Sequence, residues 1–88
     1  MKIIPQKNSD IIWRNIIGEA VLLNPLDGSY FGLNIVGCSF WEKVDGEKTI
    51  EEIIDLLLQE YKVERDVLVS DIEEFVKSLE NKGLISFK

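Results

Sequence analysis

Residues 19–34 read EAVLLNPLDGSYFGLN, and this run encodes two short strands with a tight turn between them. The strands are predicted at Glu19–Asn24 and Ser29–Leu33, because the residues that separate them are typical turn formers. Pro25 fixes the backbone φ angle, while Gly28 is free to take the left-handed conformation that many tight turns require. The run therefore predicts an antiparallel hairpin.

A third strand is predicted upstream, at Ile11–Ile16, where the sequence IIWRNI is apolar and β-branched with polar interruptions. Gly18 offers the turn into the strand that follows. Together the three strands form an antiparallel meander. Such a small sheet is stable only if helices pack on one of its faces.

The first helix is predicted directly after the hairpin. Asn34 stands at the N-cap position, because its side chain can accept a hydrogen bond from the backbone N–H groups of a helix that begins at Ile35. Asp45-Gly46 is expected to end this helix. The hairpin and the helix are therefore expected to be joined without a long loop.

Two more helices are predicted from capping and periodicity. Thr49 and Glu52 form a capping box, and apolar residues recur with a helical period over residues 50–61. The third helix is expected over residues 66–82, with Gly83 as the residue that follows its end.

The order of three strands and then three helices predicts an α+β fold, with the helices covering one side of the sheet. The apolar tail LISF, residues 84–87, is expected to pack back onto the body. A chain of 88 residues is too short for two separate cores, so we expect a single domain over residues 1–88.

The composition argues against catalysis. The chain has no histidine, which is the usual general base and the commonest metal ligand, and its single cysteine excludes an intramolecular disulfide. Cys38 is expected to be buried and inert, although a reactive thiol near a helix N-terminus is the alternative. Gly28, Gly32 and Gly37 miss the spacing of phosphate-binding loops. We expect no cofactor, no metal and no enzymatic activity.

Acidic residues fall in two groups, on the polar faces of the second and third helices. Paired carboxylates can exchange protons or bind a cation, but exposed positions on amphipathic helices favour solvated side chains. These residues are Glu51, Glu52, Asp55, Asp71, Glu73 and Glu74.

The charge of the chain selects its class of partner. The formal net charge is −6; residues 1–17 carry three basic and one acidic side chain, which leaves −8 for the rest. This charge repels nucleic acid and favours a basic peptide or a basic protein surface. A winged-helix transcriptional regulator has a similar order of elements, but Glu64–Lys82 holds six acidic and three basic residues, the wrong sign for DNA. The N-terminus lacks the apolar stretch of a signal peptide, so we expect a cytoplasmic protein and no membrane partner.

The last strand of the meander lies at an edge of the sheet, where one row of its backbone N–H and C=O groups is unpaired. Tyr30 and Phe31 must point to opposite faces of that strand, while Gly32 carries no side chain. A glycine inside a strand often marks the close approach of another backbone, which suggests that an extended peptide adds beside this strand. In the alternative, Gly32 marks a β-bulge and both aromatic residues pack on helices.

An ordered set of short motifs resembles the PqqD-like family, the peptide-recognition elements of pathways that modify ribosomally made peptides. The resemblance runs from residue 11 to residue 85. It implies a winged-helix-like fold and a non-catalytic protein that presents the leader of a precursor peptide to a maturation enzyme, such as a protease, a cyclase or a radical SAM protein. The motifs are Leu22–Pro25, Leu33-Asn34, Trp41, Asp45-Gly46, Thr49 with Glu52-Ile53, Asp71 with Phe75 and Leu79, and Gly83-Leu84.

Carried over by position, the resemblance implies a binding site between the edge strand and the third helix. Asp71 and Glu74 would meet basic side chains of the leader. The run DGSYFGLN, followed by VG and FW, looks closer to the leader-binding proteins of lasso-peptide pathways than to the protein that assists pyrroloquinoline quinone synthesis, which is the alternative. The residues implied are Ser29, Tyr30, Phe31, Gly32 and Leu33 on the strand, and Val67, Asp71, Glu74, Phe75 and Ser78 on the helix.

An exposed strand edge also permits pairing between two copies of the chain. Both a monomer and a dimer are therefore compatible with the sequence.

Overall fold

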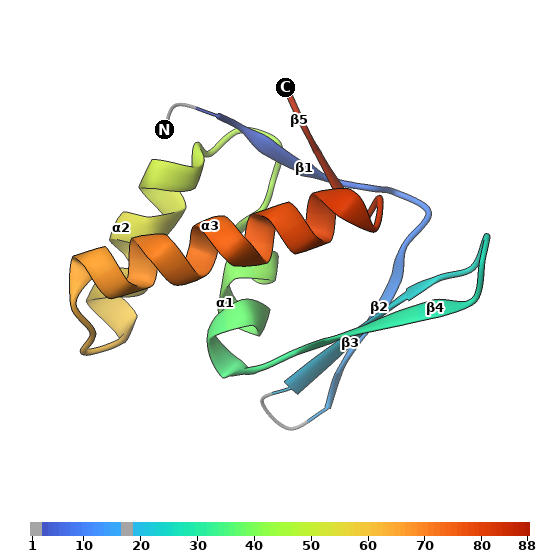
Figure 1. Cartoon of the computed structure of the whole chain (residues 1–88), viewed down its shortest axis with the longest axis horizontal. Coiled ribbons are helices and arrows are strands. Elements are labelled where there is room, and N and C mark those ends of the chain that lie inside the picture. Colours follow the sequence, from blue (N-terminus) through green and yellow to red (C-terminus); the bar gives the residue numbers. More distant parts are fainter. Residues whose placement is uncertain (1–2, 17–18) are drawn as a thin grey trace.

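A three-stranded antiparallel sheet and three helices account for most of the chain in the computed structural model, which describes residues 3–16 and 19–88 (Figure 1). The strands β2 (Ile12–Ile16), β3 (Glu19–Asn24) and β4 (Ser29–Leu33) lie in the order β2-β3-β4. Both strands of the predicted hairpin are confirmed, and the upstream strand begins one residue later than predicted. The turn predicted at Gly18 lies outside the described residues.

The turn between β3 and β4 is held by its own short-range hydrogen bonds. The Gly28 N–H donates to the Asn24 carbonyl oxygen at 2.8 Å, and the Gly28 φ angle is 74°, in the left-handed region. The Asn24 side-chain oxygen accepts from the Leu26 N–H at 3.0 Å, and the Asp27 carboxylate accepts from the Ser29 N–H at 2.9 Å. These side chains replace backbone partners that a turn cannot supply, which fixes where β4 begins.

The helices are α1 (Ile35–Lys43), α2 (Ile50–Glu60) and α3 (Arg65–Asn81). All three predicted helices are confirmed, although α3 begins and ends one residue earlier than predicted. Gly83 follows its end with a φ angle of 71°, as expected of the residue after a helix C-cap. The sheet followed by three helices confirms the predicted α+β class.

Both predicted helix caps are present. The Asn34 side-chain oxygen accepts a hydrogen bond from the Gly37 N–H at 2.8 Å, at the start of α1. At the start of α2, the Glu52 N–H donates to the Thr49 hydroxyl at 3.1 Å, and the Thr49 N–H donates to the Glu52 carboxylate at 3.0 Å. These bonds satisfy backbone donors that the helices themselves leave without partners.

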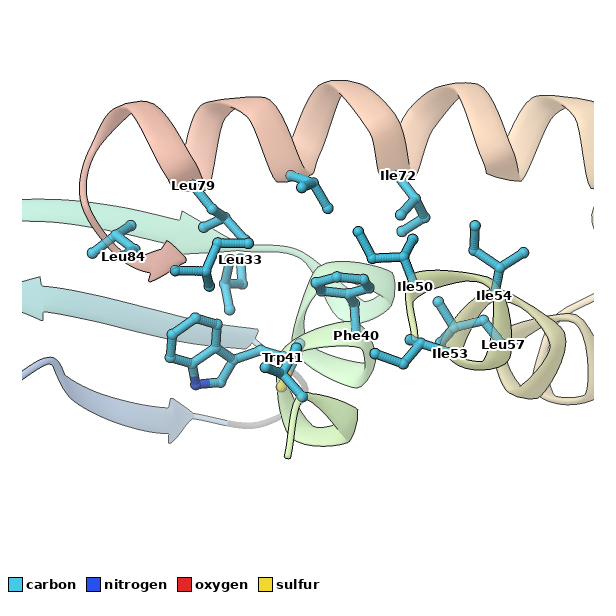
Figure 2. Packing of buried hydrophobic residues seen from close by; sticks show 14 of the residues in the cluster. Leu33, Phe40, Trp41, Ile50, Ile53, Ile54, Leu57, Ile72, Leu79 and Leu84 are labelled. Atoms are coloured by element: carbon cyan, nitrogen blue, oxygen red, sulfur yellow. The ribbon is translucent and has the colours of Figure 1, made fainter. Parts of the chain in front are cut away.

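One hydrophobic core joins the sheet to the helices. Side chains from β4, α1, α2, α3 and the segment after α3 meet in it, as Figure 2 shows for Leu33, Phe40, Ile53, Leu79 and Leu84. Phe40, Trp41 and Leu57 are at most 1% exposed, so α1 and α2 bury their apolar stripes almost completely. Burial on this scale supplies most of the stabilisation that a small sheet needs.

A second sheet of two strands was not predicted. β1 (Pro5–Lys7) pairs antiparallel with β5 (Ile85–Phe87), and Figure 1 shows β5 lying against β1. The prediction that the tail packs back onto the body is confirmed. The pairing escaped sequence analysis because both strands are only three residues long and one begins with proline, a residue that strands tolerate only at such positions.

The Lys7 side chain makes contacts between the second sheet and the rest of the chain. Its ammonium nitrogen lies 5.2 Å from the centroid of the Trp41 ring and 5.5 Å from that of Trp13, within the range of a cation–π contact. Partial burial lowers the pKa of Lys7, and the nearby carboxylates of Glu42 and Asp45 act in the opposite direction. The side chain therefore links β1 to both β2 and α1.

The capping box predicts a measurable loss of stability on truncation. Thr49→Ala removes the hydroxyl that accepts from the Glu52 N–H, and we expect the free energy of unfolding to fall by about 1 kcal/mol. Thr49→Ser is the matched control, because it keeps the hydroxyl. Urea denaturation curves with equal slopes would measure the difference. Equal stability of the Ala and Ser variants would show that the box contributes nothing.

Candidate peptide-binding site

The outer edge of β4 is open in the described part of the chain. β4 pairs with β3 and is the last strand in the order β2-β3-β4. The pairing is one to one from Asn24 opposite Ser29 to Ala20 opposite Leu33, with Val21 opposite Gly32. No residue is inserted, so the alternative in which Gly32 marks a β-bulge is wrong.

The two aromatic residues of β4 point to opposite faces, as predicted. Tyr30 is 71% exposed, whereas Phe31 is half-buried and packs against the core. Leu33, on the same face as Phe31, is 3% exposed. The alternative in which both aromatic residues pack on helices is therefore wrong for Tyr30.

Phe75 of α3 reaches the edge strand. Its ring centroid lies 6.0 Å from that of Phe31 on β4 and 5.6 Å from that of Phe40 on α1, where the two rings meet edge to face. Phe75 is only half-buried, because it lies at the margin of the core. Of the residues implied on the two elements, Phe31 and Phe75 are brought into contact.

The side of α3 that carries Phe75 also carries the other implied residues. Asp71 lies four residues before Phe75 and Ser78 three residues after it, and residues at these spacings share one side of a helix. Val67, Asp71, Glu74 and Ser78 are all exposed. Glu73 lies on the opposite side of α3, where it lines a hollow with Ile3 and Ile50.

A close approach between α1 and α3 positions Phe75. A side chain at Gly37 would place its Cβ atom 3.2 Å from the Phe75 Cζ atom and 3.3 Å from the Asn34 side-chain oxygen. Only glycine leaves room for the ring without displacement of a neighbour. Sequence analysis tested Gly37 only as part of a phosphate-binding loop and missed this role, since the contact joins residues far apart in the chain.

A shallow hollow of about 420 Å³ lies on the face of the sheet that points away from the helices. It was also missed as a candidate site. The alternation of side chains along each strand indicates which residues share a face of the sheet. It does not show which residues of neighbouring strands lie side by side, because that depends on the register. The lining residues are Ile12, Arg14, Val21, Leu23 and Tyr30.

Cys38 is buried, as predicted, with 5% of its surface exposed. Its sulfur lies 3.6 Å from a carboxylate oxygen of Glu42. Burial, followed by the charge and hydrogen bond of Glu42, raises the pKa of the thiol above its ordinary value. Both effects disfavour the thiolate that nucleophilic chemistry requires.

The acidic residues of α2 and α3 are exposed, as predicted. Glu52 is used in the capping box, and Asp55 accepts from the Arg65 guanidinium at 2.7 Å. Within residues 3–16 and 19–88, no three acidic, cysteine or histidine side chains are grouped as a metal site requires. No helix of that part is long and apolar enough to cross a membrane.

The contact at Gly37 predicts a strong coupling with Phe75. Alanine in a helix interior is favoured over glycine by about 1 kcal/mol, but in the native chain the added methyl group would press on the Phe75 ring. Phe75→Leu removes the ring atoms that lie closest to Gly37. We expect Gly37→Ala to be about 1–2 kcal/mol more favourable in the Phe75→Leu background than in the native chain.

A double-mutant cycle of urea denaturation measures this coupling between Gly37 and Phe75. Additive effects of the two substitutions would show that Gly37 does not position the ring.

Comparisons with known proteins identify the family and the fold. The family profile described as Coenzyme PQQ synthesis protein D (PqqD) matches residues 19–85. A solved structure, "TbiB1 in Complex with the TbiA(beta) Leader Peptide", has a TM-score of 0.83 and 34% identity over 92% of this chain and 94% of that chain. Another, "Lasso peptide synthetase B1 complexed with the leader peptide", has a TM-score of 0.81 and 24% identity, which shows a shared fold; it covers 94% of this chain and 98% of that chain. Functionally curated proteins gave no significant match.

The profile match includes the hairpin, the three helices and the start of β5, which is well over half of the chain. It also agrees with the resemblance identified from the motifs of the sequence. The chain belongs to the PqqD family.

Proposed function

We propose that this protein binds the leader segment of a ribosomally synthesised precursor peptide by β-strand addition and delivers it to a modifying enzyme. The observation that carries the proposal is the open edge of β4 beside the contact between Phe31 and Phe75. The complex of TbiB1 with a leader peptide supports it, because that chain is similar in fold and 34% identical in sequence.

The backbone of Ser29–Leu33 would pair with the leader. An added strand satisfies unpaired N–H and C=O groups whatever its sequence, so these bonds supply affinity, and side-chain pockets supply specificity. On the inner face of β4, the exposed parts of Phe31 and Phe75 provide an apolar floor for one leader side chain. Each is half-buried in the absence of a peptide.

The exposed side of α3 would form the wall of this site. Asp71 and Glu74 place negative charge there, which favours a leader with Lys or Arg. Val67 is 54% exposed and offers an apolar contact, and Ser78 offers a hydroxyl group. We propose these residues as the part of α3 that a leader contacts.

The protein would act without chemistry of its own. The sequence has no histidine and the Cys38 thiol is buried, which fits a binding protein rather than a catalyst. We propose that it works in the cytoplasm and serves a protease, a cyclase or a radical SAM enzyme. The run DGSYFGLN, which resembles leader-binding proteins of lasso-peptide pathways, favours a lasso-peptide pathway, and the fold is shared with a lasso peptide synthetase B1. The description of the family profile makes a role in pyrroloquinoline quinone synthesis the second candidate.

The proposal predicts where a leader perturbs the protein. In an NMR titration with the leader of a precursor encoded beside this gene, amide shifts are expected to concentrate on Ser29–Leu33 and on residues 67–78. Shifts confined to β1 and β5, or no shifts, would contradict strand addition at β4. A titration with duplex DNA is the control, and shifts on α3 in that titration would instead favour a winged-helix regulator.

Two adjacent glutamates provide a matched test of the wall. Glu74 lies on the side of α3 that carries the implied residues, whereas Glu73 lines a hollow with Ile3 and Ile50 on the opposite side. For a leader that carries Lys or Arg, Glu74→Gln is expected to weaken binding by up to about fivefold, as for an exposed ion pair. Glu73→Gln is expected to leave affinity unchanged. Calorimetry measures both, and equal effects of the two substitutions would exclude a specific wall at Glu74.

A further inference from the structure

The outer face of the three-stranded sheet carries an apolar patch, which we define as Ile12, Val21, Leu23 and Tyr30. Ile12 is 50% exposed, Val21 38% and Tyr30 71%. These side chains line the hollow of about 420 Å³, and among the described residues that line it with them only Arg14 is charged. A surface of this composition suits an apolar ligand group rather than an acidic or basic one.

The register of the sheet arranges this face in two rows. Ile12, Leu23 and Tyr30 lie side by side across the three strands in one row. The next row runs from Arg14 through Val21 to Gly32, so its last position has no side chain. The apolar patch is therefore interrupted at the open edge of β4, and we call this position without a side chain the gap at Gly32.

No contact within the described residues requires the glycine. Apart from its chain neighbours, no atom of the described residues would lie within 4 Å of a Cβ atom built at Gly32, and Gly32 is not among the described glycines with positive φ angles. Glycine in a strand costs stability relative to β-branched residues. Its usual reasons, a strained backbone or a crowded neighbour, are both missing here, which leaves the approach of a ligand as the reason.

A strand added to the edge of β4 would bring a side chain to this gap. Residues directly opposite each other in neighbouring strands point to the same face, so the leader residue opposite Gly32 would point to the outer face. Neighbouring strands lie about 4.8 Å apart, which puts the β3 backbone at Val21 roughly 10 Å from the leader backbone. A small leader side chain is too short to extend over Gly32. An aromatic side chain can cover the glycine and contact Val21 and Tyr30.

We propose that the gap at Gly32 is a specificity subsite for a bulky apolar side chain of the leader, aromatic by preference. The inference rests on the proposed strand addition at β4 and adds the chemical class of one recognised residue. An aromatic ring laid over a strand glycine shields its backbone from water, and here the ring would complete the row that begins at Arg14 and Val21. The outer face would thus select a leader side chain separately from the proposed contacts on α3.

The test is a cycle between Gly32→Val and an alanine scan of the leader. Because the space at Gly32 is open and valine is favoured over glycine in a strand, the variant is expected to retain the circular dichroism spectrum of the native chain and to be at least as stable. It is expected to bind the native leader at least tenfold more weakly, with Gly32→Ala intermediate. One leader variant, with alanine in place of a bulky apolar residue, is expected to bind the native chain weakly and the Gly32→Val chain at least as well.

Each other outcome overturns a defined part of the inference. If Gly32→Val binds the native leader with unchanged affinity, the subsite is wrong while the site at β4 stands. If Gly32→Val weakens every leader variant equally, the strand pairs there but no side chain fills the gap, and the subsite is again wrong. If the native chain binds no leader, the proposed function fails, and the subsite fails with it.

Discussion

The packing of Phe75 is the interaction on which the proposed binding face depends. One ring from α3 meets both Phe40 of α1 and Phe31 of β4, so a single side chain joins the third helix to the first helix and to the edge strand. The contact is possible because Gly37 leaves the first turn of α1 without a side chain at that point. The distance between α3 and the edge strand is therefore set by a contact in which Gly37 and Phe40 are buried, while Phe31 and Phe75 are half-buried.

The residues of the edge strand β4 differ in role according to the face of the sheet on which they lie. Phe31 and Leu33 face the helices and anchor β4 to the core, while Tyr30 and Gly32 belong to the solvent face. An added strand would present alternate side chains to these same two faces. At the proposed site, the side chains of a bound peptide would therefore contact both faces of the sheet, although the pairing bonds themselves are independent of its sequence.

Local signals accounted for most of the predicted elements. The hairpin, the caps at Asn34 and Thr49 and the periodic helices all depend on residues within a few positions of one another, which sequence analysis can assess directly. The pairing of β1 with β5 joins the two ends of the described chain, and no local sequence pattern predicts it. The contact of Phe75 with Phe31 and the rows of the outer patch also escaped prediction, because each depends on tertiary packing or on strand register.

The open edge of β4 and the acidity of the chain together make ionic strength a determinant of its state. An unpaired edge can accept a peptide or the same edge of a second copy. Two copies that each carry a net charge of −6 repel one another, whereas a basic peptide is attracted. Added salt screens both effects, so it weakens the attraction to the peptide while it removes the barrier to self-pairing. The same charge that favours the ligand thereby keeps the vacant edge from closing on itself.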